Sequence, residues 1–111
     1  MDSRRQNKVG TLLQEELAQL FQRESKNLFN GAFITVTQVR VAPDLSVARV
    51  FLSIMGKDKE KIMANVKEQN KEIRKRLAEI IRFQLRKTPE LIFVIDDSLD
   101  YAEKINNLLK K

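Results

Sequence analysis

The chain has 111 residues, and its 21 Lys and Arg against 15 Asp and Glu give it a formal net charge of +6. This surplus favours a polyanionic partner, either nucleic acid or an anionic membrane surface, although a merely soluble basic surface would carry the same charge. The absence of Cys and His excludes disulfides, thiolate and imidazole metal sites, and the commonest catalytic base.

The length and the hydropathy pattern indicate one domain in an aqueous compartment. We expect residues 1–111 to form a single domain, because a chain of this size buries enough surface to need no cross-links. The longest apolar runs are far too short to span a membrane. The polar start of the chain is not followed by an apolar signal region, so we expect a soluble, cytoplasmic protein.

The first half of the chain predicts a helix and then a β-hairpin. Apolar residues recur at helical spacing over residues 3–25, where Ser3 is a suitable N-cap, and the pattern ends at the turn Asn30-Gly31. Residues 33–41 and 47–54 are rich in β-branched side chains and flank a Pro-Asp turn, which predicts two antiparallel strands. The alternation changes parity within the first strand, so we expect a β-bulge near Gln38.

The second half predicts two helices, a strand and a last helix. Helical spacing appears within residues 57–69 and again over residues 71–86, where Ile73, Leu77, Ile80, Ile81 and Gln84 form the inner side. Pro89 ends this pattern. Residues 91–95 are almost continuously apolar, which predicts a strand buried on both faces. Residues 96–98 can cap a final amphipathic helix that carries Leu99, Ala102, Ile105, Leu108 and Leu109.

These elements follow one another in the order α-β-β-α-α-β-α. Three strands make a small sheet, which the amphipathic helices have to cover. We therefore expect an α+β fold in two layers, in which the helices pack on one face of a three-stranded sheet. The opposite face of the sheet would then be partly open.

Residues 71–87 carry the densest positive charge. Their basic members are Lys71, Arg74, Lys75, Arg76, Arg82, Arg86 and Lys87, against Glu72 and Glu79. On a continuous helix, Lys71, Lys75, Arg82 and Arg86 would share the face opposite Leu77 and could contact phosphates. The alternative is a solvated helix face on which Glu79 pairs with Lys75 or Arg82.

Smaller groups of residues are weaker candidates for RNA contact. Arg4, Arg5 and Lys8 begin the first helix, where positive charge is mildly unfavourable. Arg40 and Arg49 are expected to meet across the hairpin, and Asp44 could relieve their repulsion. Phe83 and Tyr101 could stack on bases, although such residues more often pack against a neighbouring segment.

The sequence contains no motif for catalysis or for a bound cofactor. It has no Gly-rich phosphate loop, nucleophile elbow or metal-ligand spacing. Asp96 and Asp97 are adjacent carboxylates, and capping of the last helix accounts for them. We therefore expect a protein that is not an enzyme and that binds no cofactor, metal or small-molecule substrate.

Several stretches resemble the ribosome-binding factor A family. They are RQNKVG (5–10), ITVTQVRV (34–41), DL (44–45), ARV (48–50), EIR (72–74), LRKTPEL (85–91) and DDSLDY (96–101), followed by Ile105, Leu108 and Leu109. The resemblance covers nearly the whole chain and keeps the order of the elements. It implies a type II KH-like fold that binds RNA.

The resemblance also implies a function. Members of this family bind the small (30S) ribosomal subunit at its 16S rRNA, assist late maturation and processing of the rRNA ends, and support growth in the cold. Release requires an assembly GTPase or the mature subunit. No bond-breaking step is implied, and we expect a monomer. Generic binding of nucleic acid by a KH module remains the alternative, and a scaffold for an acidic protein is a third interpretation.

One departure from the family pattern concerns the junction between the two central helices. The family has a kink there, usually Ala-any-Gly, whereas this chain has Gln69-Asn70-Lys71 and no Gly. Asn tolerates the left-handed conformation better than most residues, so Asn70 is the expected kink residue. The position of the kink determines whether Lys67 and Lys71 contribute to RNA binding.

Overall fold

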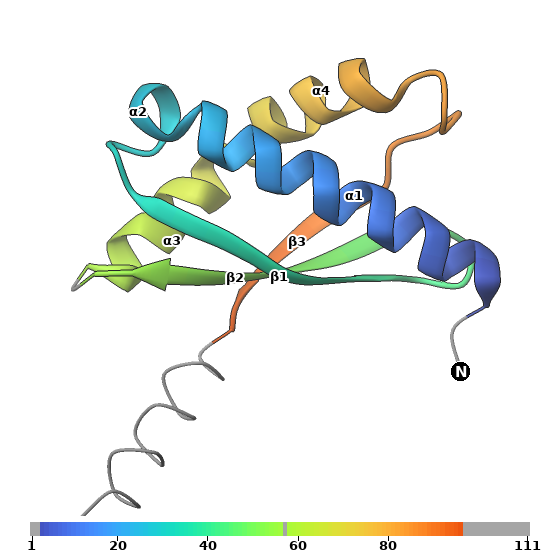
Figure 1. Ribbon diagram of the computed structural model, residues 1–111, viewed down its shortest axis with the longest axis horizontal. Coiled ribbons are helices and arrows are strands. Elements are labelled where there is room, and N and C mark those ends of the chain that lie inside the picture. Colours follow the sequence, from blue (N-terminus) through green and yellow to red (C-terminus); the bar gives the residue numbers. More distant parts are fainter. Residues whose placement is uncertain (1–2, 57, 97–111) are drawn as a thin grey trace, which may run out of the picture.

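The computed structural model describes residues 3–56 and 58–96, which form a three-stranded sheet with helices on one side (Figure 1). The elements are α1 (Arg4–Arg23), α2 (Ser25–Leu28), β1 (Phe33–Val41), β2 (Val47–Met55), α3 (Lys59–Glu68), α4 (Asn70–Ile81) and β3 (Glu90–Ile95). The α+β class and the three-stranded sheet are confirmed. A short helix, α2, adds to the predicted order, and the predicted last helix lies outside the described residues.

Helix α1 begins at a complete capping box. The Ser3 hydroxyl accepts a hydrogen bond from the Gln6 backbone N–H at 3.1 Å, and the Gln6 side chain accepts one from the Ser3 N–H at 2.8 Å. The Gln6 amide also donates to the Val41 carbonyl at 2.9 Å, which holds this end of α1 over the end of β1. A Cβ at Gly10 would lie 3.2 Å from the Val39 carbonyl oxygen, so the small residue permits close packing of α1 on β1.

The sheet has the order β1-β2-β3, with β1 antiparallel and β3 parallel to the central strand β2. The register shifts between Val36 and Gln38, which confirms the predicted bulge and leaves Thr37 as the extra residue. On β2, the side chains that face the helices are buried, namely Ala48, Val50, Leu52 and Ile54. The predicted alternation along this strand is therefore confirmed.

The prediction that β3 is buried on both faces is wrong. Leu91 and Phe93 point into the core and are only 5% and 3% exposed, whereas Ile92 is 45% exposed. The reason is topological, because β3 is an edge strand and the described helices all cover the same face of the sheet (Figure 1). A continuous apolar run does not distinguish this arrangement from a strand buried on both sides.

Helices α3 and α4 meet at a break centred on Gln69. This residue has φ −85° and ψ 7°, in the bridge region between helix and strand conformations. Asn70 is not left-handed, because Asn30 and Leu45 are the non-glycine residues with positive φ in the described part of the chain. The expected conformation at Asn70 is therefore wrong. Its side chain instead donates to the Leu91 carbonyl at 2.9 Å, which ties the junction to β3.

Helix α4 ends at Ile81, five residues before the predicted end. The N–H groups of Gln84 and Leu85 both bond to the Ile81 carbonyl as the chain turns away. Gln84, expected on the inner side, is exposed, as are Arg82 and Phe83. Leu85 packs against the core from the segment after the helix, so tertiary packing ends the helix before Pro89 does.

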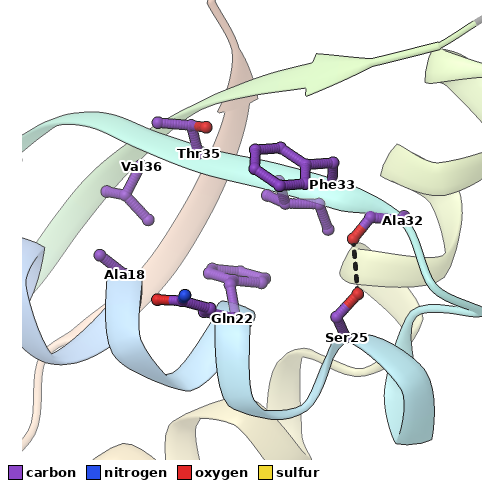
Figure 2. Close-up of a pocket in the computed structure, with 9 residues that line it drawn as sticks. Ala18, Gln22, Ser25, Ala32, Phe33, Thr35 and Val36 are labelled. Carbon is purple, nitrogen blue, oxygen red and sulfur yellow. Dashed lines mark hydrogen bonds between the residues drawn. The ribbon is translucent and has the colours of Figure 1, made fainter.

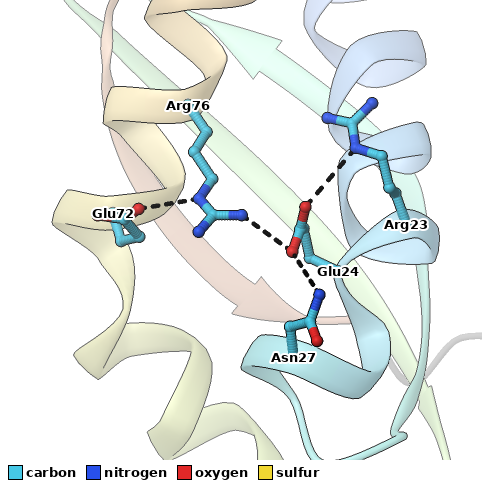
Figure 3. Close-up of polar contacts among 5 residues, drawn as sticks. All are labelled: Arg23, Glu24, Asn27, Glu72 and Arg76. Carbon is cyan, nitrogen blue, oxygen red and sulfur yellow. Dashed lines mark hydrogen bonds and ion pairs between the residues drawn. The ribbon is translucent and has the colours of Figure 1, made fainter.

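An ion-pair network joins α4 to the end of α1 (Figure 3). The Arg76 guanidinium lies 2.9 Å from a Glu72 carboxylate oxygen and 2.9 Å from a Glu24 oxygen. Glu24 also lies 3.7 Å from Arg23 and accepts a 3.3 Å hydrogen bond from the Asn27 amide. The hydrogen bond from Arg76 lowers the pKa of Glu72 below its usual range, and the same bond raises the pKa of Arg76.

Substitutions of Asn70 test the helix junction. We expect Asn70→Ala to lower the free energy of unfolding by about 1 kcal/mol through loss of the bond to Leu91. We expect Asn70→Gly to lower it by roughly 1 kcal/mol more, because Gly disfavours the helix that begins here. Urea denaturation followed by circular dichroism measures both. A Gly variant more stable than the Ala variant would instead indicate a left-handed residue 70.

Substitution of Arg76 tests the network. We expect Arg76→Gln to lower the urea midpoint at pH 7, with Arg5→Gln as an exposed control that does not lower it. The pKa of Glu72 is depressed in the folded protein, so its pairing stabilises the fold above the unfolded carboxyl pKa of about 4.3. The stabilisation is lost as the pH falls through the lower, folded value. If Arg76→Gln lost the same amount of stability at pH 7 and in strong acid, the loss would not come from the ion pair with Glu72.

Candidate nucleic-acid interface

A basic groove lies between α4 and the segment that leads into β3. It has a volume of about 660 Å³. It is lined by Asn70, Lys71, Arg74, Lys75, Ala78, Arg86, Lys87, Thr88, Glu90 and Leu91. Five of these side chains are basic, whereas Glu90 is the single carboxylate of the lining. The groove thus gathers five of the residues predicted from the sequence.

Hydrogen bonds from α4 hold the opposite wall of the groove in place. The Arg74 guanidinium donates to the Thr88 carbonyl at 2.7 Å and to the Pro89 carbonyl at 3.2 Å. Asn70 bonds to Leu91 a little further along the same segment. Thr88 and Pro89 are buried. The wall is therefore fixed to α4 before any ligand binds, and Arg74 has a structural role in the groove.

The other four cations of the groove are exposed and unpaired within the described chain. None of Lys71, Lys75, Arg86 and Lys87 forms an ion pair with another described residue. Lys71 and Lys75 are one helical turn apart, so they share a face of α4. The predicted alternative, in which Glu79 pairs with Lys75 or Arg82, does not form. Uncompensated charges along a groove attract a polyanion strongly at low salt.

Four other predicted residues do not line the groove. Arg76 lies on another side of α4, where Glu24 and Glu72 neutralise it. Arg82 lies beyond the helix end, and its guanidinium carbon is 4.6 Å from the centroid of the Phe83 ring. Phe83 is 86% exposed, so it does not pack under a neighbouring segment. Lys67 is exposed on α3 and does not line the groove.

The remaining predicted cations lie at the end of the sheet where β3 begins. Arg4 and Lys8 line a shallow hollow at the start of α1, and Arg5 beside them is exposed. Arg40 and Arg49 are direct cross-strand partners, as predicted. Val47 pairs with Glu90, and α1 is bonded to the end of β1, so these groups and the β3 wall of the groove lie at the same end of the sheet (Figure 1).

The expected role of Asp44 is wrong. Its carboxylate accepts hydrogen bonds from the Ser46 hydroxyl at 2.7 Å and the Ser46 N–H at 3.1 Å, which lower its pKa and keep it within the turn. Arg40 instead donates to the Gln38 amide oxygen at 2.7 Å when that oxygen faces the guanidinium. A neutral amide relieves the repulsion between the two arginines less than a carboxylate would.

Sequence reasoning missed the carbonyl groups and small side chains that complete the groove. Thr88 and Leu91 contribute to the lining, and their carbonyls accept the bonds that shape it. The available signal was Pro89, which requires the chain to turn after α4. The chain turns back after α4, which places residues 86–91 beside Lys71 and Lys75.

A second hollow, between α1 and β1, has a different character (Figure 2). It has a volume of about 340 Å³ and is lined by Ala18, Phe21, Gln22, Ser25 and residues 32–36. Its lining has no charged side chain, and the Ser25 hydroxyl already donates to the Ala32 carbonyl at 2.7 Å. This hollow therefore offers no positive charge to a phosphate.

The described residues provide no second kind of site. No three Asp or Glu side chains within residues 3–56 and 58–96 are grouped so as to hold a metal ion. Among the same residues, no helix is both long enough and apolar enough to cross a membrane. The basic groove and the cations at its end of the sheet are therefore the features that the function has to explain.

Comparisons with known proteins agree on one family. The family model described as ribosome-binding factor A matches residues 5–109. The ribosome-binding factor A of Cytophaga hutchinsonii is 48% identical over 100% of this chain and 84% of its own length. That of Flavobacterium johnsoniae is 43% identical over 98% and 85%.

Comparison with known structures shows a shared fold. The crystal structure of ribosome-binding factor A from Thermus thermophilus matches with a TM-score of 0.67 at 22% identity, over 81% of this chain and 94% of that one. A homology model of the Thermus thermophilus factor, fitted into the cryo-electron microscopy map of its 30S complex, matches with a TM-score of 0.63 at 26% identity, over 79% and 91%. On the family model and the sequence identities, this chain belongs to the ribosome-binding factor A family.

Proposed function

We propose that this protein is a ribosome assembly factor that binds the small (30S) ribosomal subunit at its 16S rRNA. It assists late maturation and processing of the rRNA ends, without a catalytic step of its own. The observation that carries the proposal is the basic groove of α4, with four exposed cations and no described carboxylate paired to them. Membership of the family and the related factor fitted into a 30S complex support the choice of partner.

The proposal includes a single type II KH-like domain over residues 1–111, which the order of the described elements supports. From α1 to β3, and setting aside the short α2, the order is α-β-β-α-α-β. The break at Gln69 takes the place of the glycine-containing segment between the central helices. In this interpretation the junction brings Lys71 to the mouth of the groove, whereas Lys67 lies outside it.

The proposed mechanism is recognition by shape and charge. Lys71, Lys75, Arg86 and Lys87 contact phosphates, while Arg74 keeps the groove open at a fixed width. A rigid groove binds one arrangement of the RNA better than its alternatives and so increases the population of that arrangement. Arg4, Arg5, Lys8, Arg40 and Arg49 extend the contact around the end of the sheet.

The cellular role follows from this mechanism. The protein acts in the cytoplasm as a monomer and matters most in the cold, when misfolded RNA rearranges slowly. It needs no cofactor, membrane or small-molecule substrate. Because binding favours one state of the subunit, release requires a change in that state, driven by an assembly GTPase or by completion of the subunit.

Neutralising the groove tests its contact with phosphates. We expect the variants Lys71→Gln, Lys75→Gln and Arg86→Gln each to weaken binding to small-subunit particles and to reduce the slope of log affinity against log salt by about one. The measurement is filter binding or sedimentation across a salt series.

Lys61→Gln is the matched control. Lys61 is an exposed lysine of α3 that lines a different hollow, beside Asn30 and Asp58. We expect it to leave both the affinity and the salt slope unchanged. If the groove variants have the same affinity and salt slope as the control, the groove does not contact the RNA.

A comparison of ligands tests the choice of the ribosome. We expect immature small subunits to bind more tightly than a free RNA duplex or a DNA duplex at matched salt, because charge alone is shared by all three. Equal affinity for the three would favour a generic nucleic-acid module. Binding to particles that survives charge reversal at Lys75, Arg82 and Arg86 would favour an acidic protein partner.

A further inference from the structure

The face of the sheet away from the helices carries an apolar patch. Phe33 and Met55 are cross-strand partners that are 67% and 70% exposed, and Ile92 is 45% exposed. Phe51 and Val94 are partners on the same face and are half-buried. We call these five residues the open-face patch.

Within the described part of the chain, nothing covers this patch. The helices all lie on the other side of the sheet (Figure 1). Three of the four large apolar side chains that are strongly exposed in the described residues belong to it, the fourth being Phe83. Exposed apolar side chains gathered on one face mark a binding surface more often than scattered ones do.

The last described residue is held on the side of this patch. The Asp96 N–H donates to the Leu52 carbonyl at 2.7 Å, which extends the pairing of β3 by one residue. Asp96 has the same parity as Ile92 and Val94, so its side chain lies on the open face. There the Thr37 hydroxyl donates to the Asp96 carboxylate at 2.6 Å. Asp96, the last described residue, is therefore anchored to the sheet on the face that carries the patch.

The residues that follow Asp96 have a matching apolar pattern in the sequence. Residues 97–111 contain Leu99, Ala102, Ile105, Leu108 and Leu109 at helical spacing, with charged and amide side chains between them. A helix over these 15 residues would be about 22 Å long. Each nine-residue strand of the hairpin is about 30 Å long, so such a helix fits within the face.

We propose that residues 97–111 form an amphipathic helix that docks its apolar side on the open-face patch. The segment begins at the patch, so its effective local concentration far exceeds that of a separate partner. Docking would turn the two-layered fold into three layers, with the sheet in the middle. The patch is not part of the groove, but Ile92 is the strand partner of Arg49, so the docked segment would lie beside the cations that extend the proposed RNA contact.

The single tyrosine of the chain provides the test. Tyr101 lies one turn before Ile105, and the chain has no Trp, so tyrosine fluorescence reports on this segment alone. In the full-length protein we expect acrylamide to quench Tyr101 several-fold less than it quenches free tyrosinamide. Ile105→Asp should raise quenching to the free value. Asn107→Asp, which adds the same charge about 200° around the helix, should not.

The sheet side is tested in the same assay. We expect Ile92→Asp to release Tyr101, whereas Phe83→Asp, which adds a charge at the exposed apolar residue outside the patch, should leave it protected. Ile105→Asp and Asn107→Asp lie outside the sheet, so they test the docking even if Ile92→Asp does not fold. Tyr101 as accessible as tyrosinamide in the unmodified protein would overturn the proposal. Protection that disappears on dilution, or that needs added small subunits, would overturn it too.

Discussion

The candidate interface depends on one constraint, which is the attachment of the segment entering β3 to helix α4. Three carbonyl oxygens of this segment, those of Thr88, Pro89 and Leu91, accept hydrogen bonds from Arg74 and Asn70. Without these bonds Arg86 and Lys87 would belong to a loop that could drift away from Lys71 and Lys75. A ligand would then have to order the loop on binding, at a cost in conformational entropy. The attachment makes the groove a preorganised feature.

The position of a cation around α4 decides what it does. Arg76 faces Glu24 and Glu72 and stabilises the contact between α4 and the end of α1. Arg74 faces carbonyls, and the lysines at positions 71 and 75 face solvent. The cations of residues 71–87, which are evident in the sequence, therefore serve three different roles. Only the neighbours on other elements distinguish them.

Features set by short-range interactions could be predicted from the sequence. The N-cap at Ser3, the strands of the hairpin and the bulge beside Gln38 all follow from a few adjacent residues, and the structure has them. The end of α4, the exposure of Ile92 and the partner of Asn70 could not be predicted, since each depends on which element packs nearby. For the candidate site, residue types were predictable. Their division between the groove and the ion-pair network was not.

The junction at Gln69 has a consequence for how this fold tolerates change. Its backbone angles are ones that every L-amino acid can adopt, so the bend imposes almost no requirement on the side chain there. Other elements set the direction of the chain, through packing and through the Asn70 amide, which donates to β3. The residue at position 69 can therefore change while the bend keeps its geometry. A search pattern that demands glycine at corners of this kind would pass over chains that nevertheless turn.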